Sequence, residues 1–453
     1  MTRKKTGKLL AAATAISLVT ALTACGGDSG NDAAATGGSA SPSAGASSGA
    51  APAETVKIKI LGHSTWFVQG MDAIIPEAKK NGFDLVIEKV PEGDDGANLM
   101  KTRFATNDKP DILFYQSGMT NNFGFGTPGD VFVAQDDQPW MENFDKAAWK
   151  NMLDTLEDGH WYGAPYGGTD MGVVLYNKKL FEELSLQIPT NMDEFWAVAE
   201  KIKAAGKTPV YFSGQDAWTV QLPVLISSAS QQGAELIPLM NENKAKMTDW
   251  TDRKVGMQFI QDVVDKGYAN EDILSSTYDN AQKALASGEA GMYHMATWVM
   301  NEIVAKYPEG VDNIGSFVMP FKGDGQDLAA IWAPKAMYVV KGENQDNAQR
   351  FVNWFEQPAV QDVFFANQGG IPAIKGVTKT SLTPAELDAK KYLDEGKAIG
   401  NVPYPFKFNA NVNLPTYSQE LFVKGGKTPD QALEALQKDM ETDAKSKGDP
   451  NFK

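Results

Sequence analysis

Residues 56–61 read Val-Lys-Ile-Lys-Ile-Leu, an alternation of apolar and polar side chains that stops at Gly62. A period of two with β-branched residues is typical of a β-strand that leads into a loop. Two further apolar runs, at 84–90 and 110–115, predict two more strands, and the residues from about 70 to 81 predict a helix between the first two. Because strands alternate with helices, the sequence predicts an α/β fold with a parallel or mixed sheet covered by helices on both faces.

Three helices are predicted from their start and stop signals. Thr190 with Asp193 and Glu194 resembles a capping box before an apolar pattern of helical period, which Gly206 ends. The same period recurs from Ala348 to Phe355 and stops at Pro358. A third helix should begin at Thr428-Pro429-Asp430-Gln431, where an N-cap, a proline and a glutamine stand in the preferred order.

The size and charge of the chain limit its function. It has 453 residues, 42% of them hydrophobic and 22% charged, which is a globular composition. This length exceeds what a single core of ordinary size holds, so two domains or lobes are expected. The net charge of −15 makes nucleic acid an unfavourable partner, because an acidic surface repels phosphate groups.

The sequence offers little for metal or redox chemistry. Cys25 is the single cysteine, so an internal disulfide and a cysteine-based zinc or iron–sulfur site are excluded. The three histidines, His63, His160 and His294, are widely separated and no HExxH spacing occurs. No metal ion and no cofactor are therefore expected.

The first residues have a pattern that is typical of an export signal. Residues 2–8 are basic and residues 9–19 are apolar, in a run too short to span a membrane. The run ends at Leu22-Thr23-Ala24-Cys25, which resembles the lipobox of bacterial lipoproteins, in which the cysteine is acylated. Residues 1–25 are thus predicted to be a lipoprotein signal peptide, with Cys25 as the lipidation site. Residues 26–54, rich in Gly, Ser and Ala, should form a disordered tether on the outer face of a membrane.

Several stretches resemble one protein family. The most specific is Gly172–Phe181, Gly-Val-Val-Leu-Tyr-Asn-Lys-Lys-Leu-Phe, with Pro189-Thr190 and Asp193–Phe195 after it. Met192 stands where the family usually has tryptophan. The chain resembles the extracellular solute-binding proteins of ABC importers, in the sugar-binding branch that includes maltodextrin-binding protein. Further matches follow in family order, at Pro110–Ile112, Gly288–Met292, Gly315–Pro320, a helix at 347–361 and Gly370–Pro372.

The resemblance implies a periplasmic-binding-protein-like fold of type II, with two α/β lobes, a hinge of crossing strands and a ligand cleft between the lobes. The lobes are expected at 55–168 plus about 313–342, and at 169–312 plus about 343–453. The implied function is to bind a mono- or oligosaccharide and deliver it to membrane permease subunits. The resemblance also implies that the protein is a monomer and that it is not an enzyme.

A sugar-binding site needs aromatic rings for the CH faces and carboxylates or amides for the hydroxyl groups. Asp170 matches an acidic ligand residue of maltodextrin-binding protein, Asp216 with Trp218 matches an acidic-x-aromatic pair, and Trp298 matches a stacking tryptophan. The ends of predicted strands and the expected crossings add further candidates: Trp66, His63, Tyr115, Gln116, Tyr166, Trp332 and Tyr404. An aspartate of this kind can also simply form a turn, and a tryptophan can pack in a core.

Two alternatives remain open from the sequence. A surface glycoside hydrolase would also combine tryptophans with two carboxylates, for which Asp170 and Asp216 are available. Against it, the sequence has no nucleophile elbow, no phosphate-binding loop and no eightfold succession of strands and helices. An importer protein for a non-sugar solute, such as a peptide, polyamine or oxyanion, is the other alternative, and the aromatic residues expected in the cleft favour sugar.

Overall fold

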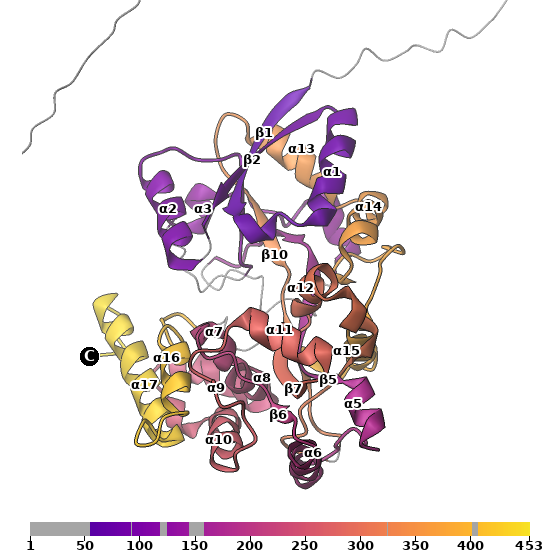
Figure 1. Ribbon diagram of the computed structural model, residues 1–453. Coiled ribbons are helices and arrows are strands. Elements are labelled where there is room, and N and C mark those ends of the chain that lie inside the picture. Colours follow the sequence, from indigo (N-terminus) through magenta and orange to yellow (C-terminus); the bar gives the residue numbers. More distant parts are fainter. Residues whose placement is uncertain (1–54, 92, 118–124, 145–157, 324, 401–405) are drawn as a thin grey trace, which may run out of the picture. The chain divides into compact units, whose positions relative to one another are not determined.

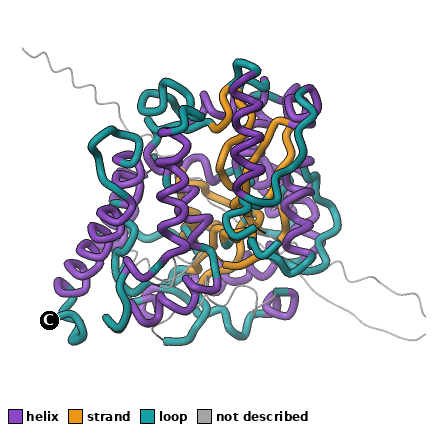
Figure 2. The backbone as a smooth tube through the Cα atoms, turned by 90° about the horizontal axis from the view of Figure 1, so that it is seen from below, coloured by secondary structure: helices purple, strands orange, loops and turns teal. Residues whose placement is uncertain are grey.

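The computed structural model describes residues 55–91, 93–117, 125–144, 158–323, 325–400 and 406–453. All of them belong to one compact unit. The predicted signal peptide, Cys25, the tether and Tyr404 lie outside the described residues. Within these residues, helices cover the strands of two separate sheets (Figures 1 and 2).

The first sheet is mixed and has the strand order β2-β1-β3-β10-β4, of which β1, β2 and β10 are labelled in Figure 1. β1 pairs in parallel with β2 and β3, while β10 runs antiparallel to β3 and β4. The three strands and the helix predicted for this part of the chain are confirmed. The strands are β1 (Val56–His63), β2 (Phe83–Val90), β3 (Ile112–Tyr115), β4 (Gly163–Tyr166) and β10 (Lys335–Val339).

The helices of this lobe bury one apolar face each. The fully buried side chains of Ile58 and Phe114 from the sheet share one core with Phe351, Phe355 and Phe364. The helices are α1 (Gln69–Lys80), α2 (Gly93–Ala105), α3 (Pro128–Val131), α13 (Gln345–Phe355) and α14 (Pro358–Gln368), with short 3₁₀ turns at Ser64–Trp66 and Pro139–Asn143. The helix expected at 347–361 is therefore two helices, because Pro358 starts a second one.

The second sheet is built around one long strand, β5. Its order is β12-β9-β5-β7-β6, and β8 and β11 also pair with β5. β5 is antiparallel to β7, β8, β9 and β11. The strands are β5 (Gly168–Asn177), β6 (Thr208–Val210), β7 (Ala290–Ala296), β8 (Ile314–Phe317), β9 (Ala329–Trp332), β11 (Ile371–Pro372) and β12 (Ala398–Gly400).

The helices of the second lobe begin with the caps that the sequence indicates. Thr428 and Gln431 form the predicted capping box of α17, whereas Asn191 rather than Thr190 caps α6. The helices are α5 (Lys178–Glu183), α6 (Met192–Ala204), α7 (Ala217–Val220), α8 (Leu222–Ser228), α9 (Gln231–Asn241), α10 (Thr251–Asp265), α11 (Tyr278–Ser287), α12 (Val299–Lys306), α15 (Pro384–Asp394), α16 (Leu414–Glu420) and α17 (Pro429–Ser446), with 3₁₀ turns at Met247–Asp249 and Pro308–Asn313.

The strand pairing corrects the expected lobe boundaries. Residues 313–342 were assigned to the first lobe, but β8 and β9 pair with β5 in the second sheet, and only β10 joins the first. Residues from 343 on were assigned to the second lobe, but α13 and α14 pack into the first core. The reason is that the buried aromatic face of α13 complements the first sheet, which its sequence period alone does not reveal.

A neutral histidine lies in the second core. His294 on β7 is almost fully buried, its ring packs on Phe259 at 4.6 Å, and its Nε2 lies 3.3 Å from the sulfur of Met319. Desolvation lowers the pKa of His294 to about 3. The unfolded chain takes up this proton near pH 6.5, whereas the folded chain does not, so acidification below that pH destabilises the fold.

We predict that His294→Leu reduces the loss of stability on acidification. Each pH unit below about 6.5 costs the wild type up to about 1.4 kcal/mol through this group, and the leucine variant does not incur that cost. Urea unfolding at pH 7.5 and pH 5 measures the difference, with the exposed His160→Leu as control. Equal pH dependence of wild type and His294→Leu would contradict this account.

Candidate ligand-binding site

A cavity of about 80 Å³ lies where the chain crosses between the two sheets. The first crossing joins β4 to β5 at Tyr166–Gly168, the second joins β9 to β10 just before Lys335, and the third follows α14 at Gln368–Gly370. Residues of all three crossings line the cavity. The full lining is Thr65, Trp66, Val68, Tyr166, Gly167, Gly168, Asp170, Trp298, Asn301, Lys335, Phe364, Gln368, Gly369 and Gly370.

Glycines make the close crossing possible. Gly167, Gly369 and Gly370 have φ angles of +82°, +74° and +93°, which residues other than glycine rarely adopt. A Cβ atom on Gly168 would lie 3.2 Å from the backbone nitrogen of Ile371 on the neighbouring strand. Together these glycines let β5 and β11 approach each other beside the cavity.

Asp170 is the one carboxylate among the described residues that line the cavity. It lies within β5, directly opposite Trp332 of β9, so the alternative of a turn-forming aspartate does not apply. Desolvation raises the pKa of Asp170 to about 6, although the charge of Lys335 and a 3.3 Å hydrogen bond donated by the Thr297 hydroxyl act in the opposite direction. At neutral pH Asp170 is therefore a poorly solvated carboxylate that gains from any further hydrogen-bond donor.

Aromatic rings of the second lobe form a continuous cluster beside Asp170. Trp298 lines the cavity, and its ring lies 5.5 Å from that of Trp332 and 6.3 Å from that of Trp218. The Trp332 ring occupies space that a Cβ of Gly172 would need, because the two would be 2.4 Å apart. Trp218 is 39% exposed, which leaves much of its side chain open to contact.

The first lobe contributes a second aromatic group. Trp66 lines the cavity, with the ring of His63 at 4.5 Å and the ring of Tyr115 at 5.9 Å. The ammonium group of Lys335 lies 5.5 Å from the centroid of the Trp66 ring. Cation–π attraction holds a lysine in such a position. Aromatic surfaces from both lobes thus reach the same cavity.

Two candidates from the sequence have mainly structural contacts. Tyr166 is almost fully buried, its hydroxyl donates to the Trp66 carbonyl at 2.7 Å, and its ring packs on Phe114 at 4.1 Å. It forms part of the cavity wall and belongs to the core. Gln116 does not line the cavity, and its backbone carbonyl accepts from the hydroxyl of Tyr338 at 2.9 Å.

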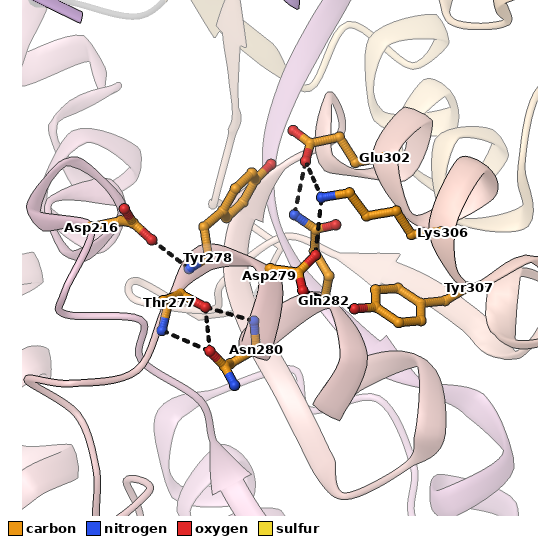
Figure 3. Close-up of polar contacts among 9 residues, drawn as sticks. All are labelled: Asp216, Thr277, Tyr278, Asp279, Asn280, Gln282, Glu302, Lys306 and Tyr307. Carbon is orange, nitrogen blue, oxygen red and sulfur yellow. Dashed lines mark hydrogen bonds and ion pairs between the residues drawn. The ribbon is translucent and has the colours of Figure 1, made fainter. Parts of the chain in front are cut away.

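Asp216 has a different environment from Asp170. Its Oδ2 accepts the backbone N–H of Tyr278, the first residue of α11, at 2.6 Å (Figure 3). The Tyr278 ring in turn packs against Trp218 at 4.9 Å. Thr277 is the N-cap of α11, and Asp216 accepts a further N–H of its first turn. Asp216 therefore holds Tyr278 beside Trp218, and it does not line the cavity.

Neighbouring charges on α11 and α12 pair with one another. Lys306 forms ion pairs with Asp279 at 2.9 Å and Glu302 at 3.3 Å, and the Gln282 amide donates to Glu302 at 3.1 Å (Figure 3). The side chain of Tyr278 extends toward Glu302, and burial and this carboxylate raise the pKa of its hydroxyl. Tyr278 was not among the sequence candidates, because its place beside Trp218 depends on contacts 60 residues apart.

The structure has a second, larger pocket of about 150 Å³ between α8, α10 and the segments 319–322 and 326–328. Its charged groups already have partners within the protein. Lys322 forms an ion pair with Asp252 at 3.0 Å, and Asp327 accepts two backbone N–H groups at 2.8 Å. Phe321 is the one aromatic residue in its described lining. The cavity at the crossings is the better candidate, because it combines aromatic rings with a carboxylate short of hydrogen-bond donors.

The described residues hold no group of three or more His, Cys, Asp or Glu side chains that could bind a metal ion. In the same part of the chain no helix is long and apolar enough to cross a membrane.

A family model for bacterial extracellular solute-binding proteins matches residues 65–362, which is more than half of the chain. The chain belongs to this family. Two relatives have similar sequences. The multiple sugar-binding protein of Streptococcus mutans is 24% identical over 299 residues, which cover 64% of this solute-binding protein and 69% of the relative. An uncharacterized ABC transporter extracellular-binding protein of Pyrococcus horikoshii is 22% identical over 413 residues, 86% of this chain and 90% of the relative.

The fold of this solute-binding protein also matches a solved structure. RafE, a solute-binding protein in complex with raffinose, superimposes with a TM-score of 0.70 and 21% identity, covering 85% of this chain and 99% of RafE. The predicted type II fold, with two α/β lobes, is confirmed by this likeness and by the two sheets.

We predict that Asp170→Asn makes the free solute-binding protein more stable at pH 7. The raised pKa of Asp170 means that the folded state binds a proton more tightly than the unfolded state, so stability falls as the pH rises from about 4 to 6. The amide removes this penalty, worth about 1–2 kcal/mol at a partly exposed carboxyl.

Thermal unfolding without ligand at pH 7 and pH 4 measures this effect. The gain in Tm should be present at pH 7 and small at pH 4, where the wild-type carboxyl is already protonated. A gain of equal size at both pH values would show that desolvation of the charge is not its cause.

Proposed function

We propose that this solute-binding protein captures a saccharide in the cavity at the crossings and delivers it to the membrane permease of an ABC importer. The observation that carries the proposal is the combination, in one cavity, of aromatic rings from both lobes with a single poorly solvated carboxylate. The name of the Streptococcus mutans relative, a multiple sugar-binding protein, and the raffinose bound to RafE support a sugar as the solute.

The chemistry of the lining fits a sugar. Pyranose rings have apolar CH faces, for which Trp66 and Trp298 offer stacking surfaces. Hydroxyl groups both donate and accept, and the carboxylate of Asp170 accepts while the amides of Asn301 and Gln368 do both. A ligand with alternating CH and OH faces satisfies both kinds of group at once.

Binding at the crossings couples the solute to the arrangement of the lobes. A ligand that contacts Trp66 on one side and Trp298 on the other favours the arrangement in which both contacts are made. The glycines at 167, 369 and 370 are the backbone positions best able to absorb a change in φ and ψ. The ligand-bound arrangement is then the form that the permease recognises.

Two further parts of the proposal concern location and chemistry. The protein is held on the outer face of the membrane by acyl chains on Cys25, from which residues 26–54 extend as a tether, and it acts as a monomer. It releases its ligand unchanged. A glycoside hydrolase needs two carboxyl groups flanking the bond, whereas Asp170 is the one carboxylate in the described cavity lining and Asp216 binds the backbone N–H of Tyr278 at the start of α11.

We predict that a neutral oligosaccharide raises the Tm of the protein by several degrees. We further predict that Trp298→Ala binds this oligosaccharide at least about tenfold more weakly than the wild type, because stacking area is lost. A thermal-shift screen with raffinose, stachyose and mannobiose, followed by titration calorimetry, measures both. Trp196→Ala is the matched control, because Trp196 stacks on Phe259 and Tyr268 in the same lobe and does not line the cavity.

A shift with amino acids or polyamines and none with sugars would contradict the proposal. So would recovery of hydrolysed sugar after incubation. Equal binding by Trp298→Ala and wild type would place the sugar at another site.

A further inference from the structure

Lys335 was not among the sequence candidates, yet it lines the cavity at the crossings. It is the first residue of β10, immediately after the crossing from β9, and is paired in register with Tyr166 of β4. Its ammonium group lies above the Trp66 ring at 5.5 Å from the centroid. Lys335 is thus held at the junction of the two lobes by the backbone of one sheet and the ring of Trp66.

Lys335 forms no ion pair with another side chain in the described part of the chain. Within it, no carboxylate oxygen lies within 4.0 Å of its Nζ, unlike that of Lys306 or Lys322, each of which has an ion pair. Its electrostatic effect falls on Asp170, since the lysine opposes the rise in the pKa of that carboxyl. An ammonium group that faces a cavity without an ion pair retains hydrogen-bond donors for a ligand.

Lys335 and Asp170 come from different sheets, on β10 and β5, and line the same cavity. The ammonium group can only donate hydrogen bonds, and the carboxylate can only accept them. A sugar hydroxyl does both, so one hydroxyl or two adjacent ones can accept from Lys335 and donate to Asp170. The two charges cancel, which favours a neutral ligand over an anionic or cationic one.

We propose that Lys335 is a specificity-determining ligand contact, which donates to a sugar hydroxyl whose proton Asp170 accepts, and so selects neutral saccharides with adjacent hydroxyl groups. This inference rests on the proposed saccharide-binding function and adds a residue and a charge rule to it. It requires that the two side chains act on the ligand as a pair.

The test is a double-mutant cycle. Titration calorimetry with raffinose, stachyose and mannobiose is carried out on the wild type, Lys335→Met, Asp170→Asn and the double variant. Each single substitution should weaken binding at least about tenfold, because it leaves a buried hydroxyl without its partner. The double variant should lose less than the product of the two single losses, because either change breaks the shared arrangement.

Lys89→Met is the matched control. Lys89 lies on β2 of the same sheet, and its ammonium group also stands over an aromatic ring, 5.6 Å from the centroid of Phe67, but it does not line the cavity. Its binding should equal that of the wild type. Melting curves of all variants without sugar confirm that each is folded.

The pH profile of binding measures whether the charge of Lys335 acts on Asp170, which the size of the affinity loss alone does not show. Affinity should fall as Asp170 is protonated, and Lys335→Met should move the midpoint to higher pH because the cation that opposes protonation is gone. The other groups that interact with Asp170 are Thr297, which follows β7 and donates a hydrogen bond to it, and Tyr278 on α11 and Glu386 on α15, on both of which its charge acts. Desolvation raises the pKa of Glu386 to about 6 as well, with a further contribution from the charge of Asp170. Glu386→Gln is therefore included, and it should move the midpoint to lower pH, opposite to Lys335→Met, because it removes a negative charge that acts on Asp170.

Three results would overturn the inference. If the wild type binds a sugar and Lys335→Met binds it equally well, Lys335 has only a structural role and the saccharide proposal stands. If the wild type prefers digalacturonate to the neutral sugars, the charge rule is wrong. If the wild type binds none of the sugars, the inference fails together with the proposed function.

Discussion

The fold and the candidate site both depend on the pairing of strand β5. This strand, Gly168–Asn177, hydrogen-bonds with β7, β8, β9 and β11. Without it, these strands would not be joined into one sheet. Its first residues lie against β11 at a crossing between the sheets, where Gly168 permits close approach. The same register sets Asp170 opposite Trp332. One set of backbone hydrogen bonds therefore assembles a lobe and positions its central carboxylate.

The site carries a cost that the rest of the structure offsets. Asp170 is poorly solvated before any ligand arrives, and Trp218 presents an apolar side chain that is 39% exposed. Both features destabilise the free protein slightly and become favourable when a ligand supplies hydroxyl donors and CH faces. The large core of the second lobe, in which Trp250, Phe195 and Phe317 are fully buried, supplies the stability that tolerates this.

Much of the fold could be predicted from local sequence, and less of the site. β1, β2 and α17 follow from apolar period and capping residues that act within a few positions. The boundary after 312 could not be derived in this way, because β8 and β9 are four residues each and join β5 from more than 130 residues away. Asp216 was predicted as a ligand residue from a short motif, and its hydrogen bond with the backbone of Tyr278, 62 residues later, carries no local signal. Lys335 carries no local signal, since its importance arises from the crossing that brings it near Asp170.

A crystal structure of the protein grown with raffinose tests the central claim most directly, because it locates the solute relative to the crossing strands. The account predicts a sugar ring in contact with Trp66 and Trp298, with one hydroxyl group within hydrogen-bond distance of Asp170 and of Lys335. A sugar bound instead in the pocket beside Met319 and Phe321, with the cavity at the crossings empty, would contradict it.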